Sequence, residues 1–143
     1  MNIFVRDILE EQIGADVLIL PLFEDNSTDT YSSLDLLVNG IISRVIKDRD
    51  FTGRHGQNML LPVNNINASR ILLTGLGKRQ GLSQEKIRQA GAKAFSAVKE
   101  IGLVDVAVST RTFDHLPGEV HFAQKPVFYF LGRVARYLPI RKI

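Results

Sequence analysis

Residues 57–75, QNMLLPVNNINASRILLTG, contain two short apolar runs that decide the fold. One run ends at Pro62 and the other at Gly75, and such bounded runs are typical of strands buried on both faces. The strands expected at residues 57–63 and 69–75 are separated by a link too short for a parallel crossover. We therefore expect an antiparallel pair within a mixed sheet.

Further apolar runs place this pair in a larger sheet. Residues 17–20 end at Pro21, residues 104–108 follow Gly102, and residues 2–5 are a weaker candidate. The elements then follow the order strand, strand, helix, strand, strand, helix, strand. This order predicts an α/β protein with three α/β/α layers and a mixed, mostly parallel sheet.

Two segments have the periodicity of amphipathic helices. The first covers residues 34–46, with Ser33 as the expected N-cap and Asp35 in the first turn. The second begins after Ser83 and ends at Gly102. Its apolar stripe consists of Ile87, Ala90, Ala94, Ala97, Val98 and Ile101.

The composition is that of a single globular domain, with 143 residues of which 45% are hydrophobic and 23% charged. The absence of cysteine excludes disulfides and thiolate metal sites. The chain lacks the apolar run of a signal peptide or a membrane span, so we expect a cytoplasmic protein. Positive charge gathers in residues 111–143, which hold 6 Lys and Arg against 2 Asp and Glu.

The stretch Gly75-Leu76-Gly77-Lys78 invites comparison with a phosphate-binding loop but lacks its spacing. A P-loop has four residues between its first glycine and Gly-Lys-Ser/Thr, whereas here Lys78 is followed by Arg79. A dinucleotide fingerprint also fails, because Gln80 stands where the third glycine belongs. We therefore expect these glycines to shape a turn.

We predict no catalytic, cofactor-binding or metal-binding residue in this chain. His55, His115 and His121 lack the spacing of a ligand set, and a two-metal site needs several convergent carboxylates. The pairs 27–28 and 109–110, each Ser-Thr, have no nearby His/Asp arrangement for nucleophilic catalysis.

The tail carries two further expectations. Residues 127–131, VFYFL, are β-prone, so we expect them to complete the sheet or to be buried against another subunit. The basic side chains are expected in a solvated or disordered terminus, or alternatively in salt-dependent contact with nucleic-acid phosphates. These side chains are Arg133, Arg136, Arg141 and Lys142.

Five stretches within residues 1–110 resemble, in order, the amino-terminal domain of leucine (cytosol) aminopeptidases. They are DVLILPLFE at 16–24, Leu34-Asp35 with Gly40, DFTGR at 50–54 with Gly56, SRILLTGLGK at 69–78, and the second helix with DVAV at 105–108. The resemblance implies a macrodomain-like fold that assists assembly of a hexamer. It places the peptidase centre, with two metals such as zinc or manganese, in a separate carboxy-terminal domain.

We therefore predict a leucine aminopeptidase N-terminal-like domain over residues 1–110 and a divergent tail over residues 111–143. The chain is expected to have an assembly or regulatory role, and to pack against copies of itself or a peptidase catalytic domain. The metal-ligand motif Asn-Thr-Asp-Ala-Glu-Gly-Arg of the resembled family does not occur here. As an alternative, fold analogy suggests a nucleotide or ADP-ribose site lined by the loops at 53–56 and 75–77.

Overall fold

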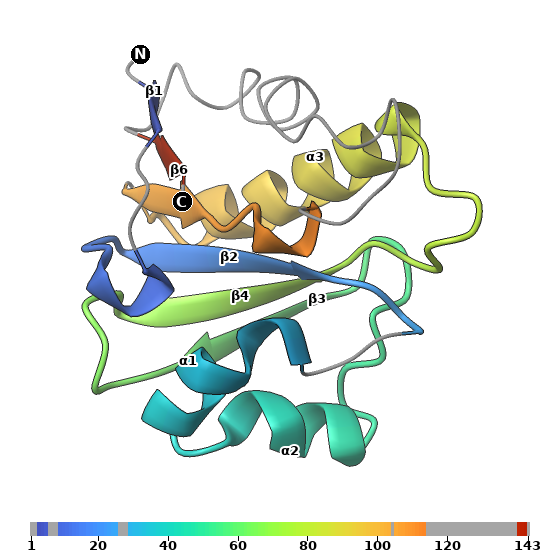
Figure 1. The fold of residues 1–143 in the computed structure, drawn as a ribbon. Coiled ribbons are helices and arrows are strands. Elements are labelled where there is room, and N and C mark those ends of the chain that lie inside the picture. Colours follow the sequence, from blue (N-terminus) through green and yellow to red (C-terminus); the bar gives the residue numbers. More distant parts are fainter. Residues whose placement is uncertain (1–2, 6–8, 26–28, 104, 114–139, 143) are drawn as a thin grey trace.

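The chain folds around a mixed sheet with helices on both faces (Figure 1). The computed structural model describes residues 3–5, 9–25, 29–103, 105–113 and 140–142. Its strands are β1 (Ile3–Val5), β2 (Val17–Leu22), β3 (Asn58–Pro62), β4 (Arg70–Gly75), β5 (Val106–Val108) and β6 (Ile140–Lys142). They follow the order β1-β6-β5-β2-β4-β3, and each neighbouring pair is parallel except β3 and β4. The prediction of a mixed, mostly parallel sheet with an antiparallel pair is confirmed.

Strand β2 lies at the centre of the sheet, and all of its residues are buried. The sequence predicts that this strand ends at Pro21, but β2 continues to Leu22, with Pro21 opposite Thr74 of β4. On the other side, pairing with β5 stops at Ile19. The second half of β2 therefore has a strand neighbour on one side, an edge-like position where proline is tolerated.

The first helical stripe forms two short helices, α1 (Ser32–Leu37) and α2 (Ile41–Lys47). Between them, Asn39 and Gly40 adopt φ values of 62° and 72°, a left-handed conformation that ends α1. The prediction of one helix over residues 34–46 is therefore wrong, and the N-cap of α1 is Tyr31 rather than Ser33. The apolar periodicity continues across the break because both helices pack into the same core.

Helix α3 (Gln84–Glu100) is the second predicted helix. The Ser83 hydroxyl accepts a backbone N–H of its first turn at 3.2 Å, as expected of the N-cap, and Gly102 lies just beyond its end with a φ of 75°. The buried positions of α3 are Ile87, Ala90, Gly91, Ala94, Phe95 and Val98. Phe95 completes the buried face, whereas Ile101, which follows the last turn, is 49% exposed.

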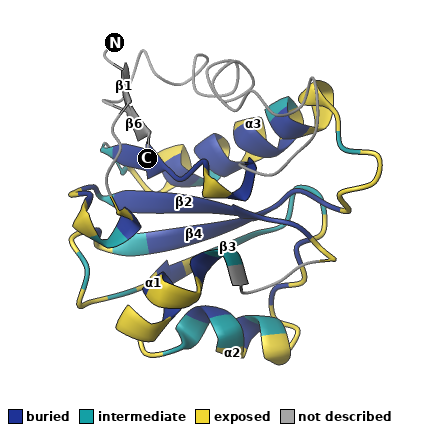
Figure 2. Cartoon of the chain, in the orientation of Figure 1, coloured by how far each residue is buried: buried dark blue, intermediate teal, exposed yellow. Residues whose placement is uncertain are grey.

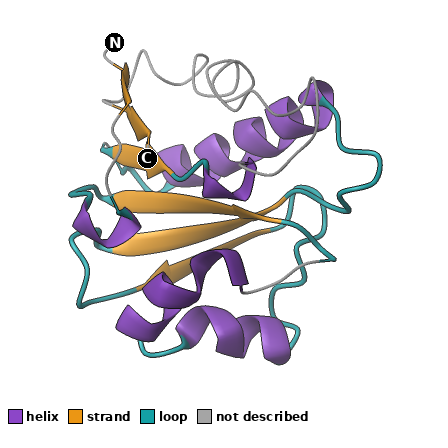
Figure 3. Cartoon of the chain, viewed as in Figure 1, coloured by secondary structure: helices purple, strands orange, loops and turns teal. Residues whose placement is uncertain are grey.

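The sheet separates two apolar cores (Figure 2). Successive residues of β2 alternate between them, with Ile19 on the α3 face and Leu18 and Leu20 on the α1/α2 face. Figure 3 shows α3 on one side of the strands and α1 with α2 on the other. This arrangement confirms the α/β/α layers.

Strand β6 inserts residues from the basic tail between β1 and β5. Arg141 is paired with Phe4 on one side and Ala107 on the other. The disordered terminus expected as one possibility for Arg141 and Lys142 is therefore wrong for these residues, whose backbone forms a strand with neighbours on both sides. Residues 127–131, Arg133 and Arg136 lie outside the described part of the chain.

Candidate functional site

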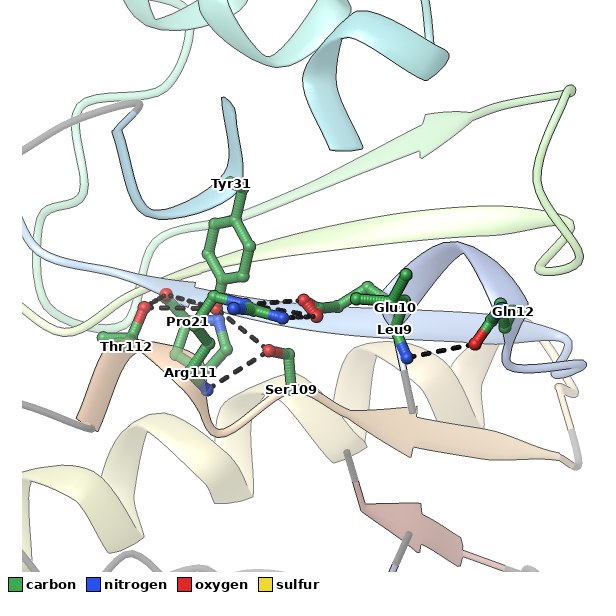
Figure 4. Close-up of polar contacts among 8 residues, drawn as sticks. All are labelled: Leu9, Glu10, Gln12, Pro21, Tyr31, Ser109, Arg111 and Thr112. Carbon is green, nitrogen blue, oxygen red and sulfur yellow. Dashed lines mark hydrogen bonds and ion pairs between the residues drawn. The ribbon is translucent and has the colours of Figure 1, made fainter. Parts of the chain in front are cut away.

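Buried hydroxyl groups gather around Tyr31 where β2 and β5 end (Figure 4). Tyr31 closes the 3-10 turn η2 (Asp29–Tyr31), Ser109 follows β5, and Thr112 lies in η3 (Arg111–Phe113). The Tyr31 hydroxyl lies 3.4 Å from Ser109 Oγ, 3.4 Å from the Pro21 carbonyl oxygen and 3.1 Å from Thr112 Oγ1. Thr112 also donates to the Pro21 carbonyl at 2.6 Å. One carbonyl group of β2 thus anchors two segments that lie far apart in the sequence.

Burial determines what these hydroxyls do chemically. Tyr31 is 2% exposed, Ser109 0% and Thr112 8%. Burial raises the pKa of Tyr31 to about 12, so the phenol stays protonated at neutral pH and acts as a hydrogen-bond donor rather than a base. Because the three hydroxyls bond to one another and to the backbone, they hold the loops after β2 and β5 in place.

An ion pair extends the cluster towards the 3-10 turn η1 (Glu10–Gln12). Arg111 donates from Nε to Glu10 Oε1 at 2.7 Å and from Nη2 to Oε2 at 2.9 Å. Glu10 is 4% exposed, whereas the Arg111 side chain is 43% exposed. The bidentate pair supplies the charge partner that a buried carboxylate requires, and it joins the segment before β2 to the segment after β5.

A cavity of about 280 Å³ lies beside this ion pair. Its charged lining residues are Glu10, Glu11 and Arg111, and it also includes Thr30 and Tyr31. Since the guanidinium of Arg111 is already paired with Glu10, the lining has an excess of negative charge. Such a lining disfavours phosphate groups, and none of the lining residues is a histidine.

The two glycine loops pack backbone against backbone at the ends of the strands. The N–H of Gly56 donates to the Gly75 carbonyl at 3.0 Å, and the N–H of Gly77 donates to the Gly53 carbonyl at 2.9 Å. The N–H of Gly75 donates to the Gln57 carbonyl at 2.8 Å. A Cβ atom on Gly75 would lie 2.0 Å from the Arg54 carbonyl oxygen, so this approach requires glycine.

This packing bears on the alternative of a nucleotide site at the same loops. A phosphate held by a glycine-rich loop is bound by free backbone N–H groups. Here the N–H groups of Gly56, Gly75 and Gly77 already donate within the chain, and that of Gly53 donates to Gln57 Oε1 at 3.1 Å. The structure brings the two loops together in a close backbone contact. Because these four N–H groups already have acceptors within the chain, they are not free to bind a phosphate.

The remaining candidate residues are scattered. His55 Nε2 lies 2.9 Å from the Lys86 carbonyl oxygen, and the other two histidines and the pair 27–28 lie outside the described residues. Within the described ranges, no group of three His, Cys, Asp or Glu side chains is placed to hold a metal ion. No helix among the described residues is long and apolar enough to span a membrane.

Several structurally important polar residues escaped the sequence analysis. Asp35, expected simply in a first turn, is a buried carboxylate that bonds to α2. The Asn39-Gly40 pair, a common turn signal, marks the helix break that Asp35 bridges. Glu10 and Arg111 gave no local signal, because their contact joins positions far apart in the sequence.

Comparison with known sequences identifies relatives of this domain. Residues 19–124 match the family model described as the cytosol aminopeptidase family, N-terminal domain. A probable cytosol aminopeptidase of Nitrosococcus oceani is 30% identical over 110 residues, which cover 76% of this chain and 22% of the relative. One from Burkholderia orbicola is 35% identical over 97 residues, covering 66% of this chain and 19% of the relative. The chain thus spans about a fifth of the length of these curated relatives.

Solved structures share the fold at lower sequence identity. A tomato leucine aminopeptidase mutant superposes with a TM-score of 0.78 at 23% identity, covering all (100%) of this chain and 32% of the tomato chain. The macrodomain of Mycobacterium tuberculosis DarG has a TM-score of 0.74 at 8% identity, covering 98% of this chain and 96% of that domain. The fold is therefore macrodomain-like, as the resemblance implied. With the family match over most of its length, the chain belongs to the cytosol aminopeptidase family and carries the family's N-terminal domain.

Proposed function

We propose that this chain is a non-catalytic domain of a leucyl-aminopeptidase-type protein, with a role in assembly or regulation. The observation that carries the proposal is the match of residues 19–124 to the N-terminal domain of the family. In such a protein, two divalent metals such as zinc or manganese act in a peptidase domain that removes N-terminal residues from peptides. The chain itself then binds no cofactor and performs no chemistry, and its partners are further copies or a peptidase domain.

The polar groups at the strand ends support a packing role. These groups are the Tyr31 hydroxyl, the Glu10 carboxylate and the glycine N–H groups. They form hydrogen bonds within the chain and do not converge on an open site. An enzyme of this family requires groups that activate water and bind a peptide, whereas the Tyr31 hydroxyl and the Glu10 carboxylate, which line the cavity beside Arg111, already have partners within the chain. We also place the protein in the cytoplasm, because its relatives carry the name cytosol aminopeptidase.

A domain exchange tests the proposal. This chain would replace the aligned segment of the Nitrosococcus oceani relative, with the unmodified relative and a variant lacking that segment as controls. We expect the chimera to reach the assembly size of the unmodified relative by light scattering and to release leucine from a leucyl amide in a metal-dependent manner. The segment-deleted variant is expected to fail in assembly.

Two results would contradict the proposal. A chimera that stays unassembled while the unmodified relative assembles would remove the assembly role. Release of leucine by the isolated 143-residue chain in the presence of zinc or manganese would show that the chain is itself an enzyme.

A further inference from the structure

Strand β3 forms an edge of the sheet, and Pro62 at its end is the one residue of the strand of a kind that usually blocks an edge. It consists of Asn-Met-Leu-Leu-Pro over Asn58–Pro62 and carries no charged side chain. Edge strands in natural proteins are commonly blunted by charges, lysine above all, because an open edge pairs readily with another strand. Among the described strands, β3 pairs with β4 alone. An uncharged edge of this kind suits association by strand addition.

The hydrogen bonds between β3 and β4 determine which backbone groups face outward. The N–H of Gly75 donates to the Gln57 carbonyl at 2.8 Å, and the N–H of Val63 donates to the Ser69 carbonyl at 3.3 Å. In an antiparallel pair, residues that bond to the neighbouring strand alternate with residues that do not. Every second residue from Gln57 to Val63 therefore bonds to β4. The residues whose backbone groups point outward are Asn58, Leu60 and Pro62.

Apolar side chains are exposed on both faces of this edge. Leu60 is 37% exposed, and it shares the α3 face with its partner Leu72. On the opposite face, a groove of about 410 Å³ has the apolar lining residues Val38, Ile41, Pro62 and Val63, with Asn39, Arg44 and Asn64 at the same groove. A partner docked on one face of the sheet would cover the exposed apolar side chains of that face alone. A strand added beside β3 would extend both faces at once.

We propose that β3 is a homodimer interface, in which a second copy of the chain adds its own β3 antiparallel to the first with Leu60 on the two-fold axis. The three outward-facing residues are symmetric about Leu60, so the strand is complementary to itself. The N–H of each Leu60 then donates to the carbonyl of the Leu60 in the other copy. Each Asn58 N–H faces a Pro62 carbonyl of the other copy, and no charged residue of the strand meets its own copy.

Pro62 fits this arrangement and limits it. Because Pro62 faces outward, its missing N–H costs no bond to β4. The same missing N–H ends the new ladder at each side, which restricts the pairing to the length of β3 and prevents a sliding register. This inference rests on the proposed assembly role, and it names the surface and the partner through which assembly occurs.

A cysteine placed on the two-fold axis tests the geometry, since the chain contains no cysteine of its own. In a hydrogen-bonded antiparallel pair the two Cα atoms lie about 5.5 Å apart, within the range of roughly 4.4–6.8 Å that a disulfide spans. Under mild oxidation, Leu60→Cys is expected to form a covalent dimer at least about tenfold faster than Ile101→Cys, because pairing raises the effective thiol concentration. Leu36→Cys is a second control, since Leu36 is 81% exposed but lies on α1.

Equal crosslinking of Leu60→Cys and either control would overturn the proposal. Sedimentation of the unmodified chain provides an independent measurement that does not depend on the variant. We expect a species of twice 16.0 kDa at high concentration, which Leu60→Lys converts to monomer and Ile101→Lys retains. An unmodified chain that stays monomeric at its highest soluble concentration would also overturn the interface.

The domain exchange separates this inference from the proposed function. If the chimera assembles while Leu60→Cys stays monomeric, the β3 interface is wrong and the assembly role stands. If Leu60→Cys crosslinks while the chimera fails to assemble, the interface stands as a property of this chain and the assembly role in an aminopeptidase is wrong.

Discussion

The Asp35 carboxylate in α1 accepts the backbone N–H of Ile42 at 2.9 Å, in the first turn of α2. The same carboxylate accepts the N–H of Ser43 at 3.3 Å and the Ser43 hydroxyl. Asp35 is 6% exposed. A side chain of one helix therefore satisfies the free N–H groups that open the next, across the left-handed turn at Asn39 and Gly40.

Replacing Asp35 should loosen the α1–α2 corner. We expect Asp35→Ala to lower the free energy of unfolding by about 1–3 kcal/mol, because buried N–H groups of α2 lose their acceptor. Asp48→Ala is the matched control, since Asp48 is exposed at the end of α2, and its effect should stay within about 0.5 kcal/mol. Urea denaturation measures both. Equal stability of Asp35→Ala and the unmodified chain would show that the cap contributes nothing.

The glycine contact predicts a size limit at Gly75. A Cβ atom there would meet the backbone of Gly53 and Arg54, which cannot move aside as a flexible side chain can. We expect Gly75→Ala to cost about 1–3 kcal/mol or more through overpacking. Gly14→Ala is the control, because nothing lies within 4 Å of its added Cβ. Thermal unfolding should show a clear loss for the first variant and little change for the second.

The Glu10–Arg111 pair predicts an asymmetric response to mutation. Arg111→Met leaves the buried Glu10 carboxylate without its cation, and we expect a loss of about 1–3 kcal/mol, since solvent partly screens the half-exposed guanidinium. Adding Glu10→Gln to this variant should recover part of the loss, because the uncompensated charge is removed. A double-mutant cycle from urea denaturation measures the coupling. Strictly additive effects would argue against a direct pair.

Tyr31 predicts a loss of stability at alkaline pH. Its folded pKa of about 12 lies above the ordinary value of 10.0, so the folded state holds the proton more tightly. The stabilisation is complete below pH 10 and is lost as the pH rises towards 12, with a total on the order of 1–3 kcal/mol. Tyr31→Phe should be less stable at neutral pH by about 1 kcal/mol and should show a flatter pH dependence. Parallel curves for the two proteins between pH 9 and 12 would contradict this assignment.

The N–H groups of the glycine loops donate hydrogen bonds within the chain, and this predicts weak or no nucleotide binding. We expect calorimetric titration of this chain with ADP-ribose to give no heat beyond dilution. Saturable binding that Gly75→Ala or Arg111→Met abolishes would restore the nucleotide alternative.

The strands were predictable because their signals are local. The short link between residues 63 and 69 determines the antiparallel pairing of β3 and β4, and no tertiary information is needed. Apolar periodicity predicts which face of a helix is buried. It does not detect the turn at Asn39, because the same face stays buried on both sides of that turn. Asn39-Gly40 was the available signal.

The polar cluster at the strand ends could not be predicted from local patterns. Tyr31 and Ser109 are 78 positions apart, and Glu10 and Arg111 are 101 apart. Serine, threonine and tyrosine occur throughout the chain, so their types alone do not indicate which of them meet. Their contacts depend on the order of β2 and β5 in the sheet, which follows from the complete fold.

The place of β6 has a consequence for synthesis of the protein. Among the described strands, β1 touches the sheet through β6, and Ile3 pairs with Ile140. Strand β1 thus has no neighbouring strand among the described ones until residues 140–142 have been synthesised. The core formed by β2, β4 and β5 can assemble earlier, since its pairings close shorter loops. During synthesis β1 is therefore expected to join the sheet after β2, β4 and β5 have paired, and to stay accessible to chaperones and proteases until then.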